Sequence, residues 1–287
     1  MTLMAWILAC AVSAAASASG SSAAKAPSTP LAAAIGDAQS DDAKRHAGLL
    51  ANLKTAAFLR TLDSAADYAE AARLHLHVDQ VVEALARNPA PSAQSAFLAL
   101  IANPAYLAED DRVTGLIRAS SNVRPAPAAL VRFWGRYSRH DDGFTPITID
   151  ALVNNGSAPA IALLERKFAD PSHPDDDKVA WMHSSILTHR NDLQLLLGCE
   201  RMLRSTLKKK LRPQLVETLF DYLPGEWFRP AVSYSPPELG AASPEALTQL
   251  VRIGDYALKS VALSPRQAAA VDKRKRGAEG MITAESH

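Results

Sequence analysis

Cysteine and aromatic side chains are scarce in this sequence, and neither sign of charge dominates it. Among 287 residues there are two cysteines, aromatic residues make up 6%, and 31 basic and 30 acidic side chains leave a net charge of +1. A nucleic-acid-binding domain is expected to be strongly basic, so this balance gives no reason to predict a nucleic-acid partner. Because Cys10 falls in an apolar leader, Cys199 is the remaining cysteine, and we predict no intramolecular disulfide and no cysteine-ligated zinc.

Short catalytic motifs are also missing. The sequence contains no G-x-S-x-G, P-loop, dinucleotide-binding fingerprint or H-E-x-x-H. Their absence argues against the hydrolases, nucleotide-binding proteins and zinc proteases that carry them. Cys199 lies in an apolar stretch and is expected to be a buried, unreactive thiol. We therefore predict no cofactor and no bound metal, and we favour a non-catalytic role.

Residues 1–26 have the composition of an export leader. An apolar run from Leu3 to Val12 is followed by small residues, and Ala16–Ala18 forms an A-x-A cleavage site. These features predict a secretory signal peptide, because the apolar run is too short for a membrane span. The protein is thus expected to be exported, either periplasmic or secreted. The alternative is lipidation of Cys10, which follows Ile7–Ala9 and would make the protein a membrane-anchored lipoprotein.

The remaining chain divides into three parts. Residues 27–40 are rich in serine, alanine and proline and are expected to form a flexible linker. In residues 41–270, apolar residues recur at three- and four-residue spacing between breaks, a pattern typical of amphipathic helices. Alanine and leucine favour helix, and β-branched or aromatic runs are few. We predict an all-α domain here, followed by a polar, disordered tail over residues 271–287.

Two segments of the helical region share a template. Residues 100–124 and 167–190 each contain Ala-Asx-Pro, then acidic residues, a basic residue and a valine. Val113 and Val179 lie 66 positions apart, which suits two helical hairpins of about 33 residues each. Hairpin starts with this spacing are expected near residues 107, 146, 176 and 212. Stacked helical hairpins are therefore preferred over the alternative layout, a compact multi-helix bundle.

The same two segments resemble the inter-helix turn and second helix of HEAT-type repeats. The likeness covers residues 78–225 and rests on the acidic, basic and valine residues of the shared template. Where HEAT repeats commonly carry arginine after the valine, this chain has Thr114 and Ala180. The resemblance implies an irregular right-handed α-solenoid of antiparallel helical hairpins, a fold that presents an extended surface to a partner.

Two clusters of histidine and aspartate raise an enzymatic alternative. Imidazole and carboxylate groups bind divalent metals or act as acid and base, so a helical envelope hydrolase or lyase is the second hypothesis. Acidic residues at the start of a helix also complement its positive end, which gives the same residues a structural role. The candidate catalytic residues are His140 and Asp141 in the first cluster and His173, Asp175, Asp176 and Asp177 in the second.

Two further stretches are candidates for a binding surface. One is a run of lysines, which can contact an anionic partner or be solvated at a helix end. The other is a Pro-rich loop whose aromatic residues can recognise a partner or seal the end of a solenoid. The leading hypothesis is an exported scaffold or adaptor that binds another envelope protein. No nucleic acid is expected, a membrane contact is expected only through a lipid anchor, and the oligomeric state is left open. The candidate contacts are Lys208, Lys209, Lys210, Trp227, Phe228 and Tyr234.

Overall fold

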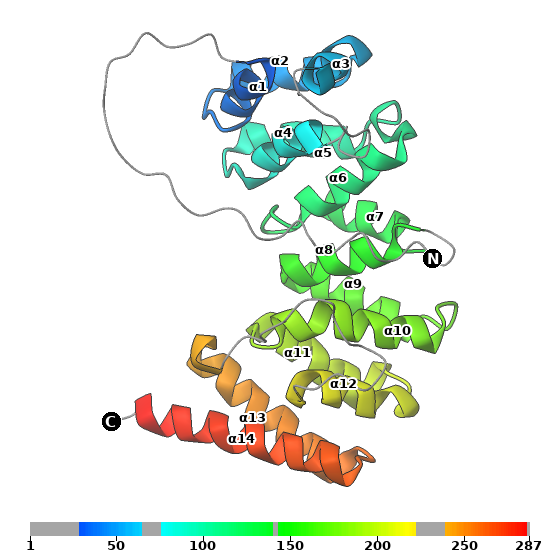
Figure 1. Cartoon of the computed structure of the whole chain (residues 1–287), viewed down its shortest axis with the longest axis vertical. Coiled ribbons are helices and arrows are strands. Elements are labelled where there is room, and N and C mark those ends of the chain that lie inside the picture. Colours follow the sequence, from blue (N-terminus) through cyan, green and yellow to red (C-terminus); the bar gives the residue numbers. More distant parts are fainter. Residues whose placement is uncertain (1–28, 65–75, 140–142, 222–238, 286–287) are drawn as a thin grey trace.

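The computed structural model describes residues 29–64, 76–139, 143–221 and 239–285 (Figure 1). Within these ranges all regular structure is helical, so the predicted all-α fold class is confirmed. The α-helices are α1 (Pro30–Ala38), α2 (Ala43–Leu53), α3 (Ala56–Ser64), α4 (Leu76–Arg87), α5 (Pro91–Ile101), α6 (Asp110–Ser120), α7 (Ala128–Arg136), α8 (Thr145–Asn155), α9 (Ala158–Ala169), α10 (Asp175–Trp181), α11 (Leu193–Arg201), α12 (Arg212–Phe220), α13 (Pro244–Ser260) and α14 (Pro265–Glu285). Short 3₁₀ or π-helical turns lie at Tyr106–Ala108, Met182–Ile186, Leu187–His189, Met202–Thr206, Lys209–Leu211 and Leu239–Ala241.

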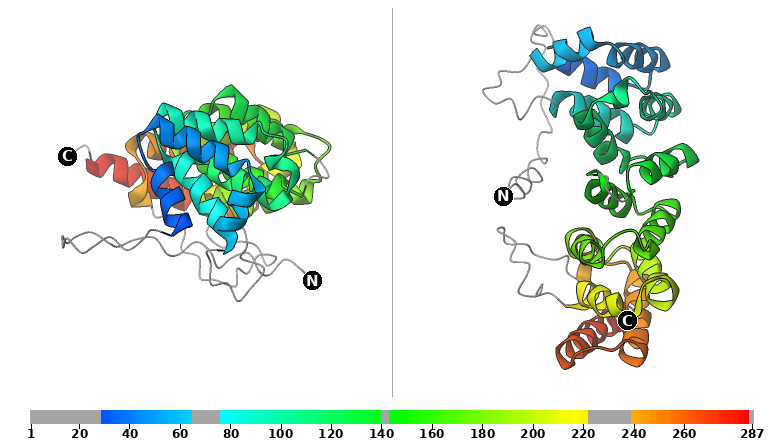
Figure 2. Two further views of the ribbon diagram at one scale, coloured as in Figure 1. Left: turned by 90° about the horizontal axis from the view of Figure 1, so that it is seen from above. Right: turned by 90° about the vertical axis from the view of Figure 1, so that its right-hand side faces the viewer.

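The helices are arranged in two rows. In one row α1 contacts α4, α4 contacts α6 and α6 contacts α8, and the row continues through α10 with its π-helical turn to α12 and α14. In the other row α2 contacts α5, and α5, α7, α9, α11 and α13 follow in order. Hairpin partners such as α8 and α9 join the rows. Figure 1 places α1 to α3 at one end of the molecule and α13 and α14 at the other, and the side view in Figure 2 shows the rows beside each other.

The acidic residues of the repeated template begin helices, as the sequence predicts. Helix α6 starts at Asp110 and helix α10 at Asp175, and both carry aspartates in their first turn. Carboxylates there complement the positive end of the helix dipole. The other two expected starts also coincide with helices, because α8 begins at Thr145 and α12 at Arg212.

Two asparagines connect successive inter-helix turns in the same way. The side-chain amide of Asn88 donates to the carbonyls of Ala38 and Ser40, at distances of 2.9 and 2.7 Å. The amide of Asn155 donates to the carbonyls of Ser121 and Val123, at 3.1 and 2.9 Å. In each case an asparagine at the end of one helix satisfies carbonyls at the end of an earlier helix in its row. The two asparagines lie 67 positions apart, close to the spacing of the template in the sequence.

A continuous hydrophobic core runs between the rows. Trp134 is fully buried, and its indole nitrogen donates to the hydroxyl of Ser120 at 2.7 Å. Cys199 is also buried in this core, and burial raises the pKa of its thiol. The low reactivity expected for Cys199 agrees with this position, because only the thiolate is a good nucleophile.

The structure corrects the expected linker over residues 27–40, because α1 occupies most of it. The hydroxyl of Thr29 accepts from the backbone nitrogen of Ala32 at 3.2 Å, and Pro30 takes the first helical position. This capped start allows a short alanine-rich helix to form. Ala34 and Ala38 are buried in the core, where α1 contacts α4. Small side chains permit this close packing. A prediction from composition alone misses it, because the same residues are also common in linkers.

The expected disordered tail over residues 271–287 is corrected in the same way. Helix α14 continues to Glu285, and its Val271 and Ala278 are buried. Its polar residues form ion pairs: Lys275 reaches Asp255 of α13 at 3.0 Å and Glu279 of its own helix at 3.1 Å. Val271 and Ala278, with Met281 and Ile282 packed beside the core, and these ion pairs together hold α14 in place.

Candidate functional site

His173, a candidate catalytic residue, is packed into the turn before α10. Its side chain is only 3% exposed, and its ring meets the ring of Trp181 edge-on, with centroids 5.0 Å apart. Its Nε2 lies 4.0 Å from Oδ2 of Asp170. The backbone nitrogen and hydroxyl of Ser172 donate to Oδ1 of Asp170, and these bonds lower the pKa of that carboxyl. The contacts show His173 as part of a closed turn.

Lys178 stabilises the turn before α10 from the buried side. Its side chain is completely buried, and its ammonium group donates to the carbonyl of Asp170. Burial lowers the pKa of Lys178, and the nearby charge of Lys208 lowers it further. Fully buried lysines are rare, and sequence reasoning did not single this one out. Its position after three aspartates looks like that of a solvated helix residue.

Asp175 connects the acidic start of α10 with the lysine run at Lys208–Lys210, two features that are far apart in the sequence. Its carboxylate forms ion pairs with Lys208, at 3.0 Å, and with Lys210. These two partners lower the pKa of Asp175, Lys210 more strongly than Lys208. The lysine run therefore meets the acidic start of α10, and two of its three charges are matched within the chain. Lys209 is exposed.

The remaining candidate residues do not come together in one site within the part of the chain that the structure describes. Asp176 and Asp177 are exposed in the first turn of α10. Among the described residues, no group of three or more histidine, cysteine, aspartate and glutamate side chains is placed to hold a metal ion. The other candidates lie outside the described residues, and their roles stay predictions: Cys10, His140, Asp141, Trp227, Phe228 and Tyr234.

Asp150 of α8 lies near a serine and a histidine of the helical turns that follow α10, Ser185 and His189. The hydroxyl of Ser185 donates directly to Oδ1 of Asp150. Burial raises the pKa of Asp150, and burial lowers the pKa of His189, whose charge interacts with Asp150. A nucleophilic serine needs a base that accepts its proton and a third group that orients the base. Here the serine bonds to the carboxylate itself, so the arrangement is a structural link between helices.

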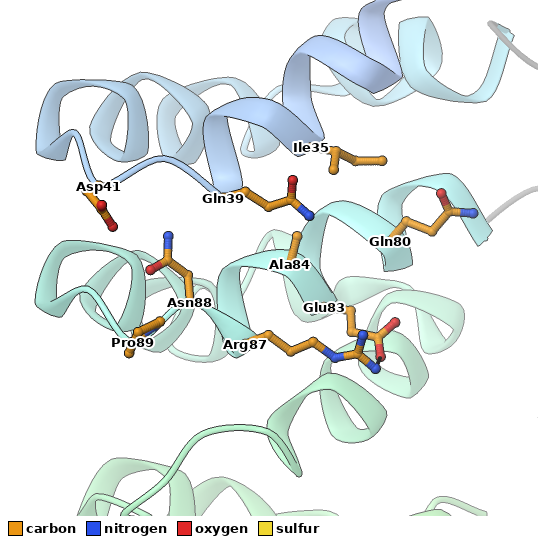
Figure 3. A pocket seen from close by; sticks show the side chains of 9 residues that line it. All are labelled: Ile35, Gln39, Asp41, Gln80, Glu83, Ala84, Arg87, Asn88 and Pro89. Carbon is orange, nitrogen blue, oxygen red and sulfur yellow. Dashed lines mark ion pairs between the residues drawn. The ribbon is translucent and has the colours of Figure 1, made fainter. Parts of the chain in front are cut away.

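One surface hollow lies between α1 and α4, with a volume of about 400 Å³ (Figure 3). Ile35 and Ala84 form its apolar part, and Gln39 and Gln80 carry amide groups beside it. The charged residues partly cancel, because Arg87 pairs with Glu83 at 2.5 Å. Asn88 also lines this hollow, and its amide is bound to the turn after α1. The hollow is therefore a weakly charged surface depression with mixed polarity.

The second hollow, with a volume of about 240 Å³, lies between α5 and α7. Its apolar surface comes from Leu98 and Ile101 of α5 and from Phe133 of α7. Arg132 and Arg136 line it as well, and both are exposed. We call these five residues the arginine groove. Its combination of an apolar floor with two cations distinguishes it from the hollow beside α1.

Further cations lie near one another at the end of α7 and on α9. Burial lowers the pKa of Lys167 of α9, and the charge of Arg139, which follows α7, adds a smaller effect in the same direction. Arg166 acts on Lys167 in the same direction, whereas Asp170 opposes the shift. Arg139, Arg166 and Lys167 are thus neighbouring cations, with Asp170 as an acidic neighbour.

Comparison of the chain with protein-family models, with curated proteins and with solved structures yields no match. Within the described ranges, none of the helices combines the length and the apolar character that crossing a membrane requires.

Proposed function

We propose that this protein is an exported, non-catalytic adaptor built as a right-handed α-solenoid of HEAT-like hairpins. The two rows of helices support the solenoid, and so do the equivalent roles of Asn88 and Asn155. The leader over residues 1–26 supports export. Mass spectrometry of the mature protein tests the export proposal: a chain beginning near Ser19 agrees with it, whereas an intact Met1 contradicts it. A lipid on Cys10 would establish the lipoprotein alternative.

The observation that carries the binding function is the arginine groove. Arg132 and Arg136 are four positions apart on one helix, where like charges repel each other. Neither has a carboxylate within ion-pair distance among the residues that the structure describes. Phe133 lies between them in sequence and is buried to 5% exposure, so the cations border an apolar surface. Unmatched charge around an apolar depression is the pattern expected of a surface whose partner supplies the opposite charge.

The partner proposed for the arginine groove is an acidic segment of another envelope protein. An apolar side chain of that segment would contact Leu98, Ile101 and Phe133, and carboxylates on either side of it would pair with the arginines. Lys208 and Lys210 suit this role less well, because Asp175 already matches them. A preformed groove on packed helices also loses little conformational entropy on binding.

A labelled peptide tests this proposal directly. The probe is a synthetic peptide with one leucine between two pairs of glutamates, and fluorescence anisotropy measures its binding at low and high salt. We expect wild-type protein to bind the peptide, with affinity that falls as salt rises, and R132E/R136E to bind it at least tenfold more weakly, an effect of about 1.4 kcal/mol or more. The matched control is R276E, which reverses an exposed arginine of α14.

Two results would contradict the proposed surface. One is equal binding by R132E/R136E and R276E. The other is equal binding of the leucine peptide and a peptide in which glycine replaces the leucine, because the apolar floor would then have no role. Circular dichroism of each variant establishes that the helices are intact, since both arginines project from the surface.

A further inference from the structure

The charged side chains of the arginine groove lie on one of its two walls. Arg132 and Arg136 both come from α7. The facing wall belongs to α5, which contains no charged residue, and it consists of Leu98, Ile101 and Ala102. A carboxylate against the α5 wall would lose water without gaining an opposite charge, which is unfavourable. The groove therefore suits an occupant whose negative charge points toward α7 and whose apolar part points toward α5.

The two guanidinium groups are placed to share one carboxylate. Residues four positions apart on a helix are neighbours, with Cβ atoms about 5–6 Å apart. The guanidinium carbon of Arg136 lies 5.3 Å from the centroid of the Tyr137 ring, within the range of a cation–π contact. A guanidinium group that stacks on a ring keeps its N–H groups, which lie in its own plane, for an acceptor. Arg136 is thus held in position, and a carboxylate between it and Arg132 would offset their mutual repulsion.

The size of the groove limits what can enter it. Its volume of about 240 Å³ is below the range of about 300–1,000 Å³ that is usual for pockets of drug-sized ligands. It suits a single apolar side chain with one carboxylate close by. Inside a chain these two groups belong to different residues, and the backbone has to continue in both directions. In the last residue of a chain, the apolar side chain and the α-carboxylate are attached to the same Cα atom.

We propose that the arginine groove binds the C-terminal residue of its partner protein. The α-carboxylate lies between Arg132 and Arg136, and an apolar side chain such as that of leucine contacts Leu98, Ile101 and Phe133. Arginine and carboxylate groups form strong, charge-assisted hydrogen bonds of defined geometry. This inference rests on the proposed binding function of the groove and specifies it, because the acidic segment of the partner is then the end of its chain.

A double-mutant cycle between the protein and a peptide tests this inference. The probe is a labelled peptide of glycine and serine that ends in leucine, made with a free carboxylate or with a C-terminal amide. Fluorescence anisotropy should show at least tenfold tighter binding of the free acid by wild-type protein, a difference of about 1.4 kcal/mol or more. R132Q/R136Q should bind both peptides equally, because the cycle isolates the contact between arginines and carboxylate. The matched control R139Q/R166Q removes two exposed cations outside the groove and should keep the full difference.

Three results would overturn the inference. One is equal binding of the acid and the amide by wild-type protein, a comparison that needs no variant. Another is the same loss in R132Q/R136Q and R139Q/R166Q, because the peptide would then respond to net charge alone. The third is equal binding of a free-acid peptide that ends in serine, since the apolar floor would then have no role.

The peptide with leucine between glutamates separates this inference from the proposed function. If that peptide binds through Arg132 and Arg136 while the acid and the amide bind equally, the groove is a binding surface and its specificity for a chain end is refuted. If none of the peptides binds, both proposals fail. Tighter binding of the free acid that depends on both arginines supports both.

Discussion

Lys178 shows how a single side chain can look ordinary in the sequence and carry an unusual role in the structure. It follows three aspartates, a context that suggests a solvated helix start. In the structure its ammonium group is buried and closes the turn through the carbonyl of Asp170. The hydrocarbon stem of lysine fills space as a leucine would, while its terminal group satisfies a carbonyl. Sequence periodicity does not reveal such an inward-pointing lysine.

The buried lysine predicts a specific dependence of stability on pH. Because the pKa of Lys178 is lowered in the folded state, the unfolded chain binds more protons between that pKa and the ordinary lysine value of about 10.4. Folding stability should therefore rise with pH in this window. The charges that act on the group are Lys208, Asp175 and Asp170. In K178M this contribution is absent, so wild type should gain stability relative to K178M as the pH increases.

Urea unfolding of both proteins at several pH values between neutrality and pH 10 measures the difference. Taking the difference between the two proteins removes the titration of residues that they share. A difference that stays constant with pH would show that Lys178 keeps its ordinary pKa.

Most individual functional residues were beyond prediction from the sequence. The acidic start of α10 was predicted correctly, since aspartates near a proline have strong local preferences. The pairing of Asp175 with Lys208 and Lys210 was not, because it joins segments that are distant in sequence. The arginine groove was not predicted for a similar reason, since its apolar floor combines residues of α5 with residues of α7.

Helices α9 and α11 approach each other closely at a glycine. A Cβ atom added to Gly198 would lie 2.2 Å from Cγ2 of Ile161, well inside van der Waals contact. Neither atom lies at the end of a flexible side chain, so the helices would have to move apart. The contact explains why a glycine is accommodated within α11 despite its low helix propensity.

We predict that G198A destabilises the protein by about 1–3 kcal/mol, the usual cost of overpacking a core. Gly135 of α7 has nothing within 4 Å of the added Cβ, so G135A is the matched control. It should stabilise the protein slightly, by up to about 1 kcal/mol, because alanine is the better helix former. Thermal or urea unfolding measures both changes. A G198A variant as stable as G135A would show that α9 and α11 are not in close contact.

Helices were predictable from the sequence where apolar periodicity was strong and where a cap or proline marked the start. Ser243 and Pro244 predict the start of α13. In the structure the serine hydroxyl accepts a hydrogen bond from the backbone nitrogen of Ala246 at 3.2 Å. Helix α1 and the part of α14 beyond residue 270 were missed, because alanine carries most of the apolar surface of α1 and the end of α14 is polar apart from a few residues. Both helical segments are stabilised by contacts with other helices. The composition of the segment alone does not show these contacts.

The described helices follow one another along one direction (Figure 1). Neighbouring helices of each row contact each other, pairs such as α4 and α5 or α13 and α14 join the rows, and the rows extend from α1 and α2 to α13 and α14 (Figures 1 and 2). The repeated template and the spacing of helix starts made this arrangement the preferred one, because successive units with similar turns stack in similar ways. The mixed hollow lies at one end of the rows, beside α1, and the arginine groove lies between α5 and α7.

Energy transfer between dyes at the two ends measures this arrangement directly. Gly36 of α1 and Gly280 of α14 are exposed and have nothing within 4 Å of an added Cβ, so G36C/G280C places a dye at each end. Cys199 is buried and is not expected to react, and C10S removes the other cysteine. The control pair G36C/G48C places both dyes on α1 and α2, at one end. A stack predicts efficient transfer for the control pair and little transfer for G36C/G280C, whereas equally efficient transfer for both pairs would show a compact bundle and contradict the solenoid.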